Sequence, residues 1–227
     1  MFMRLKVNAG RGGLNLVDDQ EFKNSEAKKH IKLFLAPSDA DVIISDANIP
    51  NFLVTDSMVE RYFALEPPPL RSIPDFDTII DEIERDYVLG QFFSALSASV
   101  VTIERLLNTA RIELHQHVAP KIKELWGKGA LNEWQPNIDA LHAWGYVSDK
   151  LADELGKLFA VRCQYFHSGN IQGLKNDALR CARAAYALLK ELIGFPDRLF
   201  RYGNEGIECI NPDDPLFKVF YAPAIQG

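Results

Sequence analysis

The chain has 227 residues, of which 47% are hydrophobic and 25% charged, and its formal net charge is −6. This apolar fraction is typical of a globular protein and excludes disorder, collagen and a coiled-coil rod. Affinity for a nucleic-acid backbone comes largely from clustered Lys and Arg, so the acidic balance argues against extended binding to a duplex, and any contact with nucleic acid must be local.

The N-terminal part shows the patterns of short strands and turns. Gly10–Gly13 reads as a flexible turn rather than a phosphate loop, because neither a Lys-Ser/Thr pair nor a helical pattern follows it. The proline run at Glu66–Leu70 favours an extended linker. We therefore predict a β-rich appendage over residues 1–72. Its predicted strands are residues 2–7, 30–35 and 41–46.

From about residue 75 the apolar period becomes helical. Asp75 or Asp77 is a suitable N-cap for a first helix that ends near Gly90, and a longer helix follows over Phe93–Ala110. A short turn of helix is expected at Lys121–Trp126. Three further apolar stripes predict helices over Ile138–Trp144, Leu151–Phe166 and Leu174–Leu192.

The tail is rich in turns, and Leu216–Tyr221 reads as a final strand that pairs with N-terminal strands. Helices with a single apolar stripe must bury these stripes against each other, and an up-and-down bundle is the simplest way to do so. We therefore predict a mainly α protein. It consists of a helical bundle over residues 73–197, with small β-containing appendages at residues 1–72 and 198–227.

The three cysteines, Cys163, Cys181 and Cys209, show no zinc-binding spacing, and an odd number suits a reducing compartment. The first residues contain no apolar stretch long enough for a signal peptide. No segment approaches the roughly 18 uncharged apolar residues that a transmembrane helix requires. We therefore expect a cytoplasmic protein without a membrane partner.

The most informative residue is Arg162. At about 100° per residue, it lies between Leu155 and Leu158, in the middle of the apolar stripe of its predicted helix. A guanidinium remains charged at any accessible pH, and burying it unpaired would cost roughly several kcal/mol. Arg162 therefore needs a carboxylate partner, an interface or an anionic ligand. Glu104 on the long helix is the candidate carboxylate.

His167 lies in the last turn of the same helix, five residues after Arg162. The partial negative charge at a helix C-terminus stabilises imidazolium, which favours a group that both accepts and donates a proton near neutral pH. Five residues place Arg162 and His167 about 140° apart. Their convergence therefore needs a loosened last turn or a second copy across a dimer interface.

An arginine, four intervening residues and a histidine at the end of a helix in an all-α bundle resemble the HEPN superfamily. Gly145–Ser148 and the leucines of Leu151–Leu158 are similar to its penultimate helix, and the Ala-rich stretch Leu174–Leu192 is similar to its last helix. The resemblance covers residues 75–196. It implies a HEPN-like up-and-down four-helix bundle that dimerises and brings two motifs into one cleft.

Many HEPN proteins are metal-independent endoribonucleases, often toxins or defence effectors, and the resemblance implies this activity here. Arg162 would hold the scissile phosphate and stabilise its developing charge, while His167 would act as general acid/base as the ribose 2′-hydroxyl attacks. No metal or cofactor is implied. The implied partners are RNA, a second copy, and a cognate antitoxin or another partner protein. After the arginine, where the family commonly has Asn, this chain has Cys163, a weak hydrogen-bond donor.

Two alternatives remain open. Other HEPN proteins are non-catalytic modules that bind nucleotides or partner proteins, and Arg162 paired with Glu104 would be purely structural.

Weaker candidates include His115 and His117, which as i and i+2 point to different sides of a helix. The remaining ones are the carboxylates Glu82, Glu84, Asp86 and Glu104, the cations Arg180, Arg183 and Lys190, and the tryptophans Trp126, Trp134 and Trp144.

Overall fold

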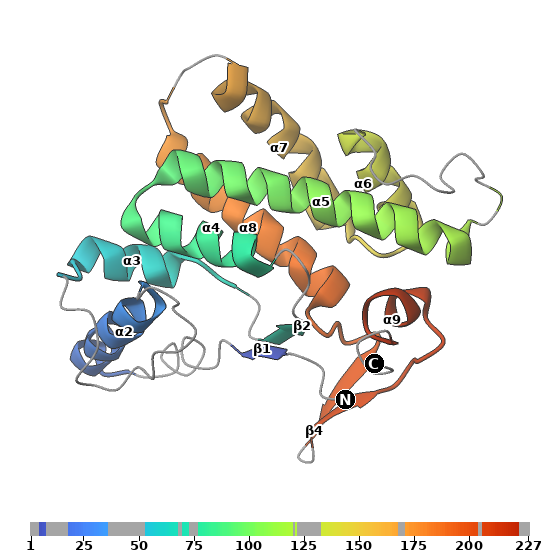
Figure 1. Cartoon of the computed structure of the whole chain (residues 1–227), viewed down its shortest axis with the longest axis horizontal. Coiled ribbons are helices and arrows are strands. Elements are labelled where there is room, and N and C mark those ends of the chain that lie inside the picture. The colour runs from blue at the N-terminus through green and yellow to red at the C-terminus, as the bar shows by residue number, and fades with distance from the viewer. Residues whose placement is uncertain are drawn as a thin grey trace.

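The computed structural model describes residues 5–7, 18–35, 53–67, 70–72, 77–119, 121, 133–167, 171–203 and 206–222. Within these residues the protein has eight helices and two small two-stranded sheets (Figure 1). The predicted class, mainly α, is confirmed. The expected turn at Gly10–Gly13, the strand at residues 41–46 and nearly all of Lys121–Trp126 lie outside the described part of the chain.

The described helices are α2 (Gln20–Leu35), α3 (Asp56–Ala64), α4 (Asp77–Leu89), α5 (Phe92–Val118), α6 (Trp134–Ala143), α7 (Asp149–His167), α8 (Leu174–Ile193) and α9 (Pro215–Phe220). The strands are β1 (Leu5–Val7), β2 (Leu70–Ser72), β3 (Phe200–Gly203) and β4 (Gly206–Cys209). The helices from α4 to α8 lie where the apolar period predicts them.

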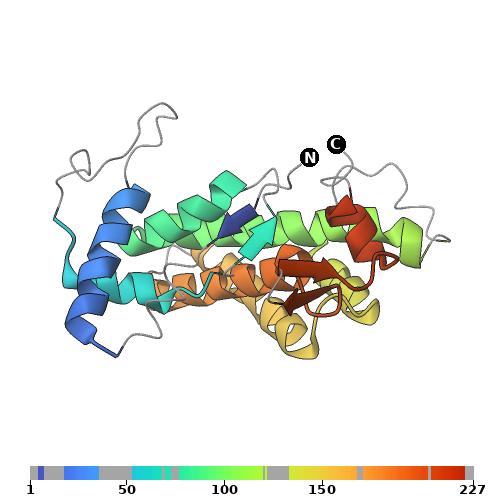
Figure 2. The ribbon, with the colours of Figure 1, turned by 90° about the horizontal axis from the view of Figure 1, so that it is seen from below.

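The long helix α5 is the central element of the core and packs against α4, α6, α8 and α9. Its buried side chains recur every three or four positions, as in Leu96, Val100, Ile103 and Leu107, each of them at most 2% exposed. Burial of each such side chain contributes about 1.5 to 3 kcal/mol. Figure 2 shows α2 and α3 at one end of the long helices, and α9 with β3 and β4 at the other.

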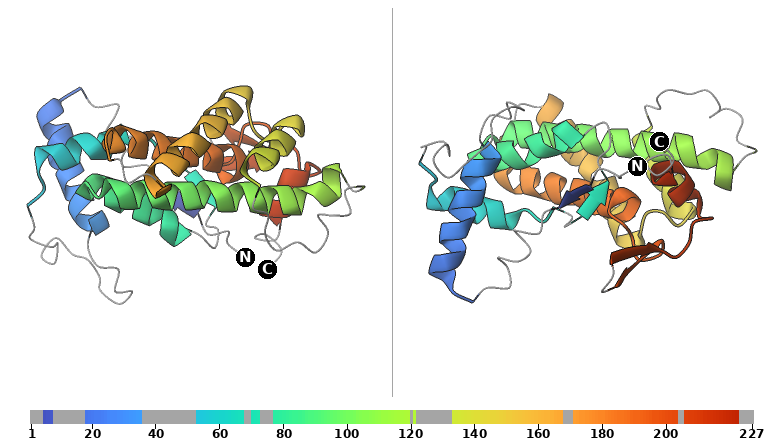
Figure 3. Two further views of the ribbon diagram at one scale, coloured as in Figure 1. Left: turned by 90° about the horizontal axis from the view of Figure 1, so that it is seen from above. Right: turned by 60° about the horizontal axis from the view of Figure 1, so that its bottom comes forward.

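Helix α7 is attached to α8 near both of its ends. The backbone N–H and hydroxyl of Ser148 donate hydrogen bonds to the Glu191 carboxylate, at 2.9 and 2.7 Å. At the other end the Tyr165 hydroxyl lies 2.6 Å from the Asp177 carboxylate. Figure 3 shows that α7 crosses α5 at an angle rather than running alongside it. Only part of α7 is therefore covered by its neighbours.

The predicted strand at residues 30–35 is wrong, because these residues continue α2. Asp19 accepts a hydrogen bond from the Phe22 N–H at 3.0 Å at the start of the helix, and Ala27 and Ile31 form its buried side at i and i+4. Alternation over six residues is too short a signal to outweigh this helical context. Helix α3, which begins after the N-cap Thr55, was not predicted.

The predicted final strand at Leu216–Tyr221 is also wrong, because α9 occupies this segment. Asp214 accepts a hydrogen bond from the Leu216 N–H at 2.8 Å, and Pro215 stands at the first helical position, where its missing N–H costs nothing. The proposed pairing of the tail with N-terminal strands does not form among the described residues. Instead β1 pairs antiparallel with β2, and β3 with β4.

The tail closes one end of the core. The ring of Tyr221 contacts the rings of Phe195 and Phe200, with centroids 5.3 and 4.9 Å away. Its buried hydroxyl donates to the carbonyl of Leu192 and accepts from the Phe195 N–H, both at 3.2 Å. These contacts hold the tail against the C-terminal end of α8.

Candidate functional site

Arg162 lies on α7, and its guanidinium is 3.8 Å from the carboxylate of Glu104 on α5. Glu104 is thus the ion-pair partner that the sequence suggested. The two side chains are 33% and 31% exposed, so solvent screens their attraction. Pairs of this kind contribute about 0 to 1 kcal/mol to stability. The contact is weak enough for an anionic ligand to replace it.

Exposed apolar side chains lie on the same sides of α5 and α7 as this pair. On α7, Phe159 and Phe166 lie about 60° and 40° round the helix from Arg162, and each is 44% exposed although the sequence pattern predicted burial. On α5, Phe93 and Val101 are 48% and 38% exposed. The rings of Phe93 and Phe166 are 5.8 Å apart between centroids, which joins the two helices into one surface. We call this surface the α5/α7 face; its residues are Phe93, Val101, Glu104, Phe159, Arg162 and Phe166.

His167 is the last residue of α7, and only its place in the helix lies within the described structure. Its side chain and residues 168–170 lie outside the described part of the chain. Convergence of His167 with Arg162 therefore stays a prediction. Cys163, which directly follows Arg162, is half-buried and makes no disulfide.

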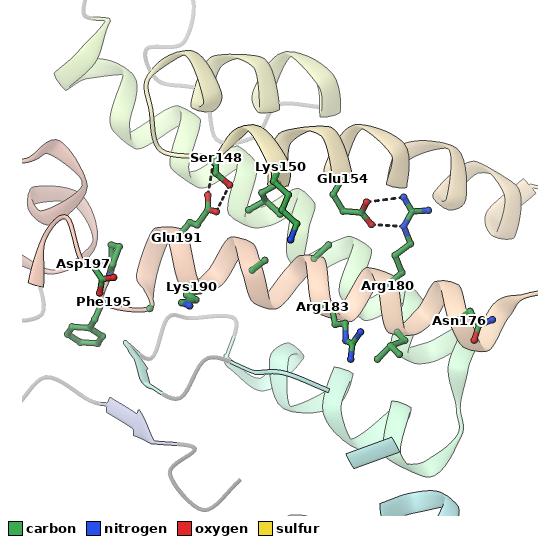
Figure 4. A pocket seen from close by; sticks show the side chains of 16 residues that line it. Ser148, Lys150, Glu154, Asn176, Arg180, Arg183, Lys190, Glu191, Phe195 and Asp197 are labelled. Carbon is green, nitrogen blue, oxygen red and sulfur yellow. Dashed lines mark hydrogen bonds and ion pairs between the residues drawn. The ribbon is translucent and has the colours of Figure 1, made fainter. Parts of the chain in front are cut away.

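A second feature is a cavity of about 870 Å³ between α7 and α8, which we call the α7/α8 groove (Figure 4). It is lined by Lys150 and Glu154 of α7 and by Arg180, Arg183 and Lys190 of α8. Figure 4 shows Lys150 extending from α7 across the groove toward α8. Small and apolar side chains form much of the remaining lining, among them Leu151, Leu179, Ala184 and Ala187.

The arginines of the groove have partners. Two hydrogen bonds of 2.5 and 3.1 Å join the Arg180 guanidinium to the Glu154 carboxylate, and this contact raises the pKa of Arg180. Arg183 donates to the Ala64 carbonyl and lies 2.9 Å from the Glu66 carboxylate. Arg180, Arg183 and Lys190 were sequence candidates for a phosphate contact beside Arg162. The structure places them instead in the groove, whereas Arg162 contacts α5.

Lys150 was missed by sequence reasoning. Its position opposite α8 depends on how α7 and α8 pack, and no local pattern reports that packing. The one available signal was its i, i+4 spacing to Glu154, which places both residues on one side of a helix.

Among the described residues, the remaining weaker candidates do not assemble into a further site. His115 is buried, with its ring nitrogen against the Ile112 carbonyl, whereas His117 is exposed. Desolvation raises the pKa of Asp86, which lies 3.7 Å from Arg85. The indole N–H of Trp134 donates to the Leu155 carbonyl at 2.9 Å, which is a packing role. Trp126 lies outside the described residues, and Trp144 is half-buried against the core.

Within the described residues, no group of three or more His, Cys, Asp or Glu side chains is arranged to hold a metal ion. None of the described helices combines the length and the apolar character needed to cross a membrane. Comparison of the chain with protein-family models, with curated proteins and with solved structures found no match.

Proposed function

We propose that the chain is a HEPN-like metal-independent endoribonuclease, with Arg162 and His167 as its catalytic residues. The corresponding four-helix bundle would consist of α4, α5, α7 and α8, with the motif on the third of them. Contacts of α5 with α4 and α8, and of α8 with α4 and α7, support this arrangement.

The partial exposure and the weak ion pair of Arg162 are the observations that support this proposal most strongly. Its guanidinium is partly exposed on an apolar face and is paired at 3.8 Å with a single carboxylate among the described residues. A phosphodiester accepts two parallel hydrogen bonds from a guanidinium, which is a stronger contact than a screened surface ion pair. An RNA phosphate could therefore replace Glu104 at little cost.

A second copy of the chain would complete the site. The exposed rings of Phe93, Phe159 and Phe166 form the kind of apolar surface that marks an interaction site. In a twofold-symmetric dimer each such residue meets the same surface of the partner. Such a dimer would bury the rings and bring two copies of Arg162 and His167 together.

The proposed reaction is an attack of the ribose 2′-oxygen on the adjacent phosphorus. The bond from O2′ to phosphorus forms and the bond from phosphorus to O5′ breaks, which leaves a 2′,3′-cyclic phosphate and a 5′-hydroxyl. His167 of one copy accepts the 2′ proton, and His167 of the partner subunit supplies the proton that the leaving oxygen takes. Arg162 stabilises the negative charge that develops on the phosphorane oxygens.

The test compares wild type with Arg162→Ala and His167→Ala on labelled single-stranded RNA in the presence of a chelator. We expect each substitution to lower the cleavage rate at least about 100-fold while the melting temperature changes little. Arg85→Ala is the matched control, because it removes a surface ion pair of similar length, 3.7 Å, on α4. Full activity in both motif variants, or activity that requires a metal, would contradict the proposal.

The second candidate is a non-catalytic HEPN-like module that binds a nucleotide or a partner protein as a dimer. The Glu104 carboxylate beside Arg162 and the thiol at position 163 favour it, because both lower the suitability of the site for phosphoryl transfer. An inert wild type whose nucleotide affinity falls in Arg162→Ala would support this module. A large loss of stability in Arg162→Ala, without activity in wild type, would identify a structural ion pair.

A further inference from the structure

Two arginines lie at the junction of α3, α4 and α8. Arg61, in the last turn of α3, donates a hydrogen bond of 2.8 Å from its Nε to the Val88 carbonyl near the end of α4. Arg183 of α8 donates to the carbonyl of Ala64, the last residue of α3, from Nε at 3.0 Å and from Nη2 at 2.8 Å. Figure 4 shows the Arg183 side chain turned away from α7. The C-terminal ends of α3 and α4 therefore hold two guanidinium groups at one junction.

Tyr87 of α4 belongs to the same junction. The residue is only 1% exposed, and its ring packs against the Phe92 ring with the centroids 5.4 Å apart. The Arg61 guanidinium lies 6.0 Å from the centroid of the same Phe92 ring. Burial raises the pKa of the Tyr87 hydroxyl, whereas the charges of Arg61 and Arg183 lower it. Among the described residues, the charges that act on this hydroxyl are thus both positive.

Several hydrogen-bond donors at this junction lack an acceptor. The Tyr87 hydroxyl and the two terminal nitrogens of Arg61 make no hydrogen bond or ion pair within the described part of the chain. Solvent reaches the hydroxyl oxygen, since it is not one of the buried side-chain atoms that lack a partner. A buried ring that presents an unpaired hydroxyl beside two cations is suited to donate a hydrogen bond to an anion.

The positive charge at this junction is only partly balanced. Glu66, whose carboxylate lies 2.9 Å from Arg183, is 71% exposed, so their ion pair is screened and weak. Among the described residues, no carboxylate pairs with Arg61. The acids Glu60 and Asp86 each precede a residue of the junction by one position, which turns them about 100° round α3 and α4. An anion that displaces Glu66 would therefore meet two positive charges.

We propose that the junction of Arg61, Tyr87 and Arg183 binds inorganic phosphate or the phosphate group of a small phosphomonoester. The phosphate oxygens accept hydrogen bonds from the two guanidinium groups and from the phenol hydroxyl. A dianion balances two guanidinium charges, and a guanidinium can donate two parallel hydrogen bonds to a phosphate. A phosphodiester or a carboxylate carries a single negative charge and is a poorer match. The site shares no residue with the α5/α7 face and does not depend on the function proposed above.

The test is isothermal titration calorimetry of the full chain in a chloride buffer of constant ionic strength. The probes are inorganic phosphate, phenyl phosphate and dimethyl phosphate. We expect the first two to bind with similar affinity, and dimethyl phosphate, a monoanionic diester, to bind at least tenfold more weakly. Tyr87→Phe keeps the buried ring and removes the hydroxyl, so it should weaken phosphate binding about tenfold, as expected for one hydrogen bond to a charged group.

Glu66→Gln provides a second measurement at an exposed position. Removal of the competing carboxylate should raise the affinity for phosphate several-fold. The control Arg201→Gln, which removes a positive charge from the exposed surface of β3, should change this affinity less than twofold. Absence of phosphate binding, equal affinity for dimethyl phosphate, or equal weakening by Arg201→Gln would overturn the inference. Loss of binding in Arg162→Ala, with Tyr87→Phe unaffected, would assign the anion to the α5/α7 face and overturn it too.

Discussion

Arg162 and Glu104, which are 58 positions apart in the sequence, face each other across the α5/α7 face at 3.8 Å. The carboxylate satisfies the guanidinium in the absence of a ligand and competes with any phosphate that approaches it. A contact this long and this exposed is a weak competitor. The ion pair therefore holds the Arg162 side chain in place and leaves its guanidinium accessible to an anion.

Removal of the Glu104 charge tests this competition. We expect Glu104→Gln to keep the fold and to change the free energy of unfolding by less than about 1 kcal/mol. RNA affinity should rise several-fold, because the phosphate no longer has to displace a carboxylate. Anisotropy and chemical denaturation measure the two quantities. A fall in affinity with the fold intact would show that Glu104 positions Arg162 rather than competing for it.

The α5/α7 face predicts the oligomeric state. Phe93→Ser and Phe166→Ser together should convert a dimer to a monomer in light scattering, because they remove apolar area from the centre of the proposed interface. Both rings are nearly half exposed, so the monomer should lose little stability. Phe22→Ser, on α2 and 52% exposed, is the control that should leave the dimer intact. A dimer that survives the double substitution would place the interface elsewhere.

The contact between Tyr165 and Asp177 predicts a measurable coupling between α7 and α8. Tyr165→Phe removes a hydrogen bond to a carboxylate, and we expect a loss of about 1.5 to 3 kcal/mol in the free energy of unfolding. In a double-mutant cycle with Asp177→Asn, the two losses should add only in part, because both substitutions remove the Tyr165–Asp177 hydrogen bond, whereas only Tyr165→Phe removes the 2.9 Å contact with the Gln172 carbonyl. Additive losses would show that the two side chains act independently.

The buried thiol of Cys181 leads to the prediction that the stability of the protein depends on pH in the alkaline range. Burial raises the pKa of its thiol to about 12, from the usual value of about 9. Below pH 9 the thiol is protonated in both states; above it, the unfolded chain loses the proton first, so stability falls as the pH rises toward 12. One such group contributes a slope of at most about 1.4 kcal/mol per pH unit.

Cys181→Ala should remove this contribution. Urea unfolding of wild type and variant between pH 8 and 11 measures the slope of the unfolding free energy against pH. The alanine variant loses some packing at every pH, so only the slope is diagnostic. Equal slopes in the two proteins would show that the thiol does not titrate on unfolding in this range.

The helices from α4 to α8 were predictable because each buries one stripe over many residues, and a period of 3.6 is then unambiguous. Helices α2 and α9 were not. In residues 30–35 and 216–221 the local alternation resembled a strand, and the capping residues Asp19 and Asp214 lie outside those windows. The secondary structure of a short segment is determined more by its capping residues and its packing neighbours than by its own pattern of apolar and polar residues.

The candidate site was predictable only in part. A charged Arg162 side chain within an apolar stripe needs a partner, and Glu104 was the predicted carboxylate, which the structure confirms. The exposure of Phe159 and Phe166 did not follow, because a helical wheel assumes that a stripe is covered along its whole length. The groove could not be predicted either, since Lys150 and Lys190 come together only through the packing of two helices.

The burial of Tyr221 has a consequence for the order of events during synthesis. This residue contacts Leu192, Phe195 and Phe200 and closes the C-terminal end of α8. A nascent chain from which residues 215–221 have not yet emerged from the ribosome leaves these apolar groups open to water. Although domains generally begin to fold from the N-terminus during synthesis, this core is completed only by a residue that is synthesised after all the helices from α2 to α8.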